Sequence, residues 1–304
     1  MRTFAPAVSA AAKTRPATPP APLGDRPVGV FDSGLGGLSV LRHLPAALPG
    51  VPLVYLADTA RAPYGGRPAA EIVAFGEQIA DLLLGEYGCG ALVVACNTAT
   101  AAAVQVLRRR HPEVPIVGME PAVKPAALAT HTGVVGVMAT AGTIGSEKYA
   151  ALLSRYGRDV RVVADPCTGL VELIEAGQLA GPALEARLRQ ITAPMRAAGA
   201  DAIVLGCTHF PLVAEAIARV VGPDVALIDP APAVVRQVVR RVGAPQPPTG
   251  LAAPSPPVTF LTSGDEAAFR QNLRTLVPSM LAGALIKTVD WPQPPPRAEG
   301  PRST

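Results

Sequence analysis

The stretch ALVVACNTAT (residues 91–100) and its counterpart AIVLGCTHFP (residues 202–211) share one design. Each is a short apolar run that ends at a cysteine, and small polar residues follow that cysteine. A run of this kind is typical of a strand buried on both faces of a parallel sheet. Open α/β sheets carry their chemistry at the carboxyl ends of such strands. We therefore expect two thiols, Cys96 and Cys207, one from each half of the chain, at a functional site.

The strand pattern that precedes the first cysteine recurs ahead of the second. VGVFDS (residues 28–33) parallels VGVMAT (residues 135–140) when their glycines are aligned. The interval from the last residue of each pattern to the following cysteine is 63 residues in the first half and 67 in the second. This spacing predicts two related α/β halves that present the ends of their first and third strands to a shared cleft. The alternative is that any two strand–helix modules look this alike.

Composition and charge limit the class of protein. The chain has 304 residues, of which 49% are hydrophobic, but no uninterrupted apolar stretch of membrane-spanning length, so we expect a cytoplasmic protein with no membrane partner. Residues 1–26 and 289–304 carry +3 of the net charge of +4. The near-neutral remainder lacks a basic stripe, which favours a small-molecule substrate over a direct nucleic-acid partner. The four cysteines, none in a Cys-x-x-Cys pair, fit a reducing compartment.

Local composition predicts two folded domains between two loose ends. Residues 1–26 are dominated by Ala and Pro without periodicity, so we expect a disordered tail; the alternative is an organelle transit peptide, which the prolines oppose. We expect residues 289–304 to be loose as well. Strand, loop and helix alternate through the rest of the chain. This order predicts an α/β fold of two pseudo-symmetric, doubly wound parallel-sheet domains with the active site in the cleft between them.

A pair of opposed thiols suits the exchange of the hydrogen on the α-carbon of an amino acid. A racemase needs a base on one face of that carbon and an acid on the other, and it exchanges their roles in the reverse direction. Because a free cysteine has a pKa of about 8.5, one thiol can be a thiolate beside a protonated partner, given a helix N-terminus or a nearby histidine. The alternative is that Cys96 and Cys207 are inert buried residues, as many buried thiols are.

Four motifs together resemble the glutamate racemase family of the aspartate/glutamate racemase superfamily. They are DSG (residues 32–34), PYG (63–65), ACNTA (95–99) and GCTHFP (206–211), and the likeness spans roughly residues 27–288. The cysteine motifs alone indicate the superfamily, which also contains aspartate and hydantoin racemases. The other motifs narrow the resemblance to glutamate. The resemblance implies a cofactor-independent, two-base mechanism that makes D-glutamate for peptidoglycan, in a homodimer.

The resemblance also implies how the chain divides into domains. The first domain would consist of residues 27–118 and 226–288, and the second domain, residues 119–225, would be inserted between them. The segments IDP (residues 228–230) and VTFLTSGD (258–265) would be the strands that return to the first domain.

The resemblance assigns roles to residues near the two strand ends. Cys96 is expected to be the base for D-glutamate and Cys207 the base for L-glutamate. In each direction, the other thiol reprotonates the α-carbon from the opposite face. Asp32 is expected to hold the substrate ammonium or to manage the proton of Cys96; the alternative is a helix-capping aspartate. His209 is expected to lower the pKa of Cys207 or relay its proton; the alternative is a turn residue near the cleft. Donors for the substrate carboxylates are expected from Ser33, Tyr64, Gly65, Asn97, Thr98 and Thr208, and less directly from Thr140 and Thr143.

Three further acidic or thiol side chains have weaker signals. Glu175 resembles a family acid placed near the second thiol, and the alternative is an exposed helical glutamate. Cys89 and Cys167 lack the strand-to-helix setting of the other two cysteines, so we expect both to be structural.

Rival chemistries lack their reagents. A pyridoxal-phosphate racemase needs a Schiff-base lysine, and none of the four lysines follows a strand-end pattern. Zinc bound by Cys96, Cys207 and His209 would use an unusual Cys-x-His spacing and would occupy the thiols. We therefore expect no cofactor and no metal. The remaining alternatives are an aspartate or broad-specificity racemase of the same superfamily, and a non-enzymatic amino-acid-binding protein.

Overall fold

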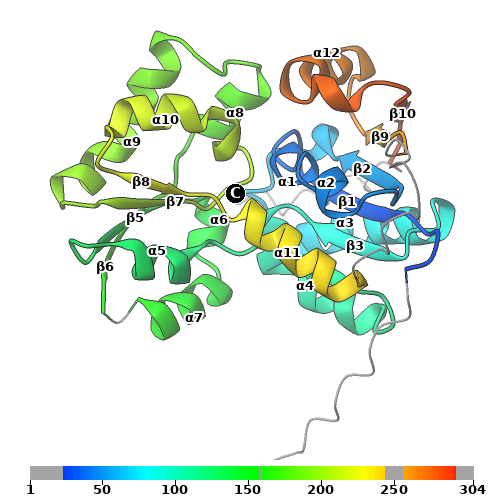
Figure 1. Ribbon diagram of the computed structural model, residues 1–304, viewed down its shortest axis with the longest axis horizontal. Coiled ribbons are helices and arrows are strands. Elements are labelled where there is room, and N and C mark those ends of the chain that lie inside the picture. The colour runs from blue at the N-terminus through cyan, green and yellow to red at the C-terminus, as the bar shows by residue number, and fades with distance from the viewer. Residues whose placement is uncertain (1–22, 158, 244–255, 292–304) are drawn as a thin grey trace, which may run out of the picture.

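The structure is a computed structural model that describes residues 23–157, 159–243 and 256–291. It consists of two α/β halves that lie side by side, each built around its own sheet (Figure 1). Every strand pairing among these residues is parallel, as the prediction of parallel sheets requires. Within the described ranges, no helix combines the length and apolar character that a membrane span requires.

Within the described residues, the first sheet has six strands in the order β10-β9-β2-β1-β3-β4. Its central strand β1 pairs with β2 on one side and with β3 on the other. All residues of these three strands are buried, which explains their nearly continuous apolar sequences. The strands are β1 (Val28–Asp32), β2 (Leu53–Ala57), β3 (Ala91–Val94), β4 (Ile116–Gly118), β9 (Thr259–Thr262) and β10 (Leu285–Thr288).

In the part of the chain that the structure describes, the second sheet has four strands in the order β6-β5-β7-β8. This order repeats the order β2-β1-β3-β4 of the first sheet, so β3 and β7, the strands that precede the two cysteines, occupy equivalent places. The prediction of two pseudo-symmetric parallel sheets is therefore confirmed. The strands are β5 (Val134–Met138), β6 (Arg161–Asp165), β7 (Ala202–Leu205) and β8 (Ala226–Ile228).

One strand assignment from the sequence is wrong. Residues 228–230 do not return to the first sheet as a strand, because Ile228 ends β8, which pairs with β7. A strand there covers the edge of β7, which would otherwise be left unpaired. The other expected returning strand, β9, does pair with β2 of the first sheet. We keep the division of the chain into two domains as a proposal. In it, the chain returns from the second domain to the first after Ile228.

Helices cover both faces of each sheet, and the pleat of the strands alternates their side chains between two cores. In β1, Val30 joins one apolar cluster and Phe31 the other. The first half has α1 (Leu38–Leu41), α2 (Leu44–Ala47), α3 (Ala69–Asp81), α4 (Asn97–Arg110), α11 (Ala231–Val242) and α12 (Glu266–Leu276). The second half has α5 (Val123–Ala129), α6 (Ala141–Ile144), α7 (Glu147–Tyr156), α8 (Leu170–Glu175), α9 (Pro182–Ala197) and α10 (Ala214–Val221). Short 3-10 or π turns complete them at η1 (Thr59–Arg61), η2 (Leu82–Glu86), η3 (Phe210–Val213) and η4 (Pro278–Met280).

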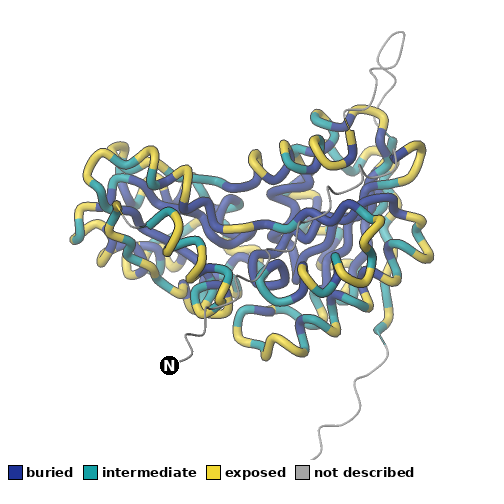
Figure 2. Tube along the Cα trace, turned by 90° about the horizontal axis from the view of Figure 1, so that it is seen from below, coloured by how far each residue is buried: buried dark blue, intermediate teal, exposed yellow. Residues whose placement is uncertain are grey.

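The edges of both expected tails belong to the folded part of the chain. Leu23 is buried in the first apolar cluster, and Val289 and Trp291 pack against the second. The expectation of loose ends is thus wrong for residues 23–26 and 289–291, because apolar side chains there find buried surface. The rest of both tails lies outside the described residues. Figure 2 shows the buried residues as a dark blue interior in each half.

Candidate active site

A cavity of about 250 Å³ lies between the two halves, at the carboxyl ends of the central strands. Residues after β1, β2 and β3 form one wall, and residues after β5, β6 and β7 form the other. All of the predicted site residues line it except Asp32, Thr143 and Glu175. Those that do are Ser33, Tyr64, Gly65, Cys96, Asn97 and Thr98 from the first half and Thr140, Cys207, Thr208 and His209 from the second.

Cys96 lies at the N-cap of α4. Its Sγ accepts a hydrogen bond from the Ala99 backbone N–H at 3.4 Å and donates to Ser33 Oγ at 3.8 Å. Burial, and next the charge of Asp32, raise the pKa of the Cys96 thiol, while the Ala99 N–H lowers it. This sulfur is therefore held as a thiol, at a helix end whose dipole favours the thiolate once the proton leaves.

Cys207 has a different neighbour, the imidazole of His209. Cys207 Sγ lies 3.6 Å from His209 Nδ1, and His209 Nε2 lies 2.5 Å from Glu175 Oε1. Burial lowers the pKa of His209, but hydrogen bonds to Cys207 and Glu175 outweigh it and raise this pKa well above its usual value. The result is an imidazolium beside the sulfur, which stabilises negative charge there. The exposed-glutamate alternative for Glu175 does not hold, because its carboxylate faces His209.

Glu175 also reaches the first half. Its Oε1 accepts a hydrogen bond from the backbone N–H of Leu35 at 2.7 Å. Burial raises the pKa of Glu175, but the bond from His209 and that N–H bring it below its usual value. One carboxylate therefore fixes the histidine and joins the two halves.

Asp32 lies behind the cavity wall and is fully buried. Its Oδ2 accepts from the Gly37 N–H at 2.8 Å, and its Oδ1 accepts from Thr208 Oγ1 at 3.4 Å. Burial raises the pKa of Asp32 from 3.8 to about 6, although the charge of His209 opposes this. A carboxyl with a pKa near neutrality can exchange a proton under ordinary conditions. Asp32 thus holds the loop that leads to α1, and it bonds to the second half as well.

Glycines in the loop after β1 allow close approach of the second half. A Cβ on Gly34 would lie 2.0 Å from Glu175 Oε1, and a Cβ on Gly36 would lie 2.5 Å from His209 Nδ1 and from Thr208 Oγ1. These positions require glycine because there is no room for a side chain. The glycine-rich turn therefore serves contact between the halves.

Hydroxyl groups meet across the halves at the side of the cavity. Thr98 Oγ1 lies 2.9 Å from Thr140 Oγ1, which lies 3.0 Å from Thr143 Oγ1. Thr143 is buried behind Thr140, so it is one step removed from the cavity wall. Nearby, the backbone N–H of Gly142 donates to Gly65 O at 3.0 Å.

Asn97, the first residue of α4, offers unused hydrogen-bonding groups. Its side-chain Oδ1 and Nδ2 are buried and have no hydrogen-bond partner among the described residues. Buried amides are normally paired, so these two atoms point to a polar ligand. The helix N-terminus at the same place favours an anionic one.

Tyr64 contributes differently from the expectation. Its hydroxyl donates to Asp58 Oδ2, so that hydrogen is not available to a substrate carboxylate. Tyr64 still lines the cavity. The sequence could not predict this hydrogen bond, because no sequence pattern marks Asp58 as the partner of Tyr64.

Part of the cavity wall went unpredicted. Residues 166–169 and Glu172 also line it, including Cys167, which we expected to be only structural. Cys167 has a left-handed φ of 51°, and its N–H donates to Asp165 Oδ1 at 2.7 Å. The segment follows β6, so the rule that identified the other strand ends would also have identified this one.

The described residues do not provide a set of ligands for the zinc ion considered above. In the parts of the chain that the structure describes, no group of three or more His, Cys, Asp or Glu side chains is placed to hold a metal ion. Cys207 pairs with His209, whereas Cys96 bonds to Ser33 and Ala99.

Fold and site together define a class: two-sheet α/β proteins that place one thiol from each half at a shared cavity. Residues 36–238 match the model of the family described as Asp/Glu/Hydantoin racemase, and the chain belongs to this family. It is 54% identical over 217 residues to a glutamate racemase of Pseudomonas aeruginosa, covering 71% of this chain and 82% of the relative. It is 50% identical over 248 residues to a glutamate racemase of Herpetosiphon aurantiacus, covering 81% and 95%.

Solved structures agree with this assignment. An Escherichia coli glutamate racemase in complex with L-glutamate and the activator UDP-MurNAc-Ala aligns with a TM-score of 0.76 at 30% identity, covering 87% of this chain and 98% of that one. A Francisella tularensis glutamate racemase in complex with D-glutamate aligns with a TM-score of 0.73 at 29% identity, covering 88% and 98%.

Proposed function

We propose that this protein interconverts L- and D-glutamate without a cofactor, by proton transfer between two thiols. The observation that carries the proposal is the cavity to which equivalent strands of the two halves each bring a cysteine, Cys96 and Cys207. Family membership and relatives named glutamate racemase support glutamate as the substrate. The D-glutamate supplies peptidoglycan synthesis.

The reaction from L-glutamate begins at Cys207. Its thiolate, beside the His209 imidazolium, removes the α-hydrogen, so the C–H bond breaks and an S–H bond forms. The electron pair left on the α-carbon takes a proton from the Cys96 thiol on the opposite face. Cys96 then becomes the thiolate, at the N-terminus of α4, and starts the reverse reaction from D-glutamate.

Polar groups of the cavity wall hold the substrate. The unpaired amide of Asn97 and the N-terminus of α4 suit one carboxylate, and the hydroxyls of Ser33, Thr98 and Thr208 supply further donors. Asp32 is behind the wall, and its charge acts on Cys96. We therefore assign it to the proton of Cys96 rather than to the substrate ammonium.

We place the enzyme in the cytoplasm, as a homodimer. A reducing compartment suits its four free cysteines, two of which must stay reduced for the reaction.

Optical rotation of L-glutamate solutions tests this function. Protein stripped of pyridoxal phosphate and treated with chelator should bring the rotation to zero. Aspartate, shorter by one methylene, should react with a kcat/KM lower by roughly 10- to 200-fold. Faster loss of rotation with aspartate would indicate the sister activity, and no loss with either acid would indicate a binding protein.

A further inference from the structure

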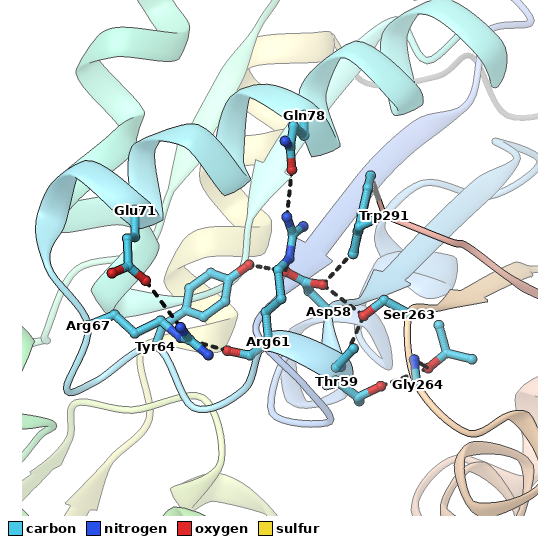
Figure 3. Close-up of polar contacts among 12 residues, drawn as sticks. Asp58, Thr59, Arg61, Tyr64, Arg67, Glu71, Gln78, Ser263, Gly264 and Trp291 are labelled. Atoms are coloured by element: carbon cyan, nitrogen blue, oxygen red, sulfur yellow. Dashed lines mark hydrogen bonds and ion pairs between the residues drawn. The ribbon is translucent and has the colours of Figure 1, made fainter. Parts of the chain in front are cut away.

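Asp58 accepts hydrogen bonds from four side chains (Figure 3). Its Oδ2 accepts from the Tyr64 hydroxyl and from Arg61 Nε, the latter at 2.6 Å. Its Oδ1 accepts from Ser263 Oγ and from Trp291 Nε1, each at 2.7 Å. We call these five residues the Asp58 latch. It joins the loop after β2, the end of β9 and the segment after β10.

Charge and aromatic packing hold the latch together. Asp58 is fully buried, so its carboxylate needs both a counter-charge and hydrogen bonds. Arg61 provides the charge, and its guanidinium lies over the rings of Phe75 and Trp291, 4.1 Å and 4.3 Å from their centroids. Trp291 therefore contacts both partners of the buried ion pair.

The latch reaches the active site through Tyr64. Tyr64 and the next residue, Gly65, line the cavity. Gly65 O in turn accepts the N–H of Gly142 from the second half. A Cβ on Gly65 would lie 3.0 Å from Thr140 Cβ, so this loop fits closely between the halves. A small displacement of Tyr64 would change both the cavity wall and the contact between the halves.

We propose that Asp58 and Trp291 are positioning residues for the substrate cavity, through which the segment after β10 holds Tyr64 and Gly65 in their binding-competent place. The inference rests on the proposed function in one respect, because one of its readouts is the KM for glutamate. Trp291 is the single tryptophan of the chain, so its emission reports on the latch alone.

Two variants remove one hydrogen bond each from Asp58 Oδ1. Trp291→Phe keeps an aromatic ring over Arg61, and Ser263→Ala keeps the tryptophan. Each variant should raise the KM for glutamate about three- to tenfold, with little change in kcat. This loss is part of the free energy that one hydrogen bond to a charged group contributes. Thr130→Val is the matched control, because Thr130 Oγ1 donates to the Asp201 carboxylate outside the cavity. It should lower the Tm and leave the KM unchanged.

Fluorescence supplies a readout that is independent of turnover. Glutamate should shift the emission of Trp291 in the wild-type protein, and Ser263→Ala should need more glutamate for the same shift. In a wild-type protein that racemises glutamate, an unchanged KM in both latch variants, or an emission spectrum that glutamate does not alter, would overturn the proposal. Failure of the wild-type protein to racemise glutamate would count against the proposed function instead.

Discussion

At the scale of single residues, the two thiols differ in their neighbours although their strands are equivalent. Cys96 donates to Ser33, whereas Cys207 faces the imidazolium of His209. The first arrangement favours the thiol and the second favours negative charge on sulfur. In the proposed mechanism, Cys207 is accordingly the base and Cys96 the acid when the reaction starts from L-glutamate.

Asp32 gives a stability prediction at the same scale. Its pKa is raised from 3.8 to about 6 in the folded protein, so folding favours the protonated form. The stability it contributes is complete below pH 4 and is lost as the pH rises through 6. At pH 8, the free energy of unfolding of Asp32→Asn should therefore exceed that of the wild type by about 1–3 kcal/mol, so the variant should unfold at a higher urea concentration. Near pH 4 the two proteins should differ little.

The same variant should lose racemase activity, because an amide cannot exchange a proton on behalf of Cys96. Urea unfolding at the two pH values and kcat/KM at pH 8 check both parts. A variant that is less stable than the wild type at pH 8 would contradict the assigned cost of burying the Asp32 charge.

At the scale of elements, the loop between β1 and α1 determines how the halves meet. A methyl group on Gly34 would collide with the Glu175 carboxylate, which holds His209. Gly34→Ala should therefore lower kcat/KM at least about tenfold and cost about 1–3 kcal/mol of stability through overpacking. Gly85→Ala is the control, since a Cβ there meets nothing within 4 Å. Activity of Gly34→Ala equal to that of the control would show that this contact is dispensable.

The sequence predicts those elements whose signals are local. The apolar runs of β3 and β7 and the cysteines that follow them identify the two central strands and their thiols. The three residues of β8 carry no sign of which sheet they join, because only pairing with β7 decides it. The donor role expected of Tyr64 failed for a similar reason. The hydroxyl of Tyr64 bonds to Asp58, and Asp58 also accepts a hydrogen bond from Trp291, 233 residues further along the chain.

At the scale of the whole molecule, the active site exists only where the two halves meet. Neither half alone holds both thiols or both walls of the cavity. Hydrogen bonds that cross between the halves at the cavity include Thr208 to Asp32, Leu35 to Glu175, Thr98 to Thr140, and Gly142 to Gly65. The two-thiol mechanism requires that one thiol act on each face of the same carbon.

Isotope distribution in D2O tests that requirement most directly. L-glutamate is incubated with the wild-type protein in D2O, and the reaction is stopped after a small fraction has turned over. The two enantiomers are then separated, and the deuterium content of each is measured by mass spectrometry. Two opposed thiols predict D-glutamate that carries one solvent deuterium at the α-carbon, while the remaining L-glutamate keeps its original hydrogen. Cys96→Ala and Cys207→Ala should form no labelled D-glutamate. D-glutamate that retains the original hydrogen, or racemisation that survives either substitution, would contradict the two-thiol mechanism.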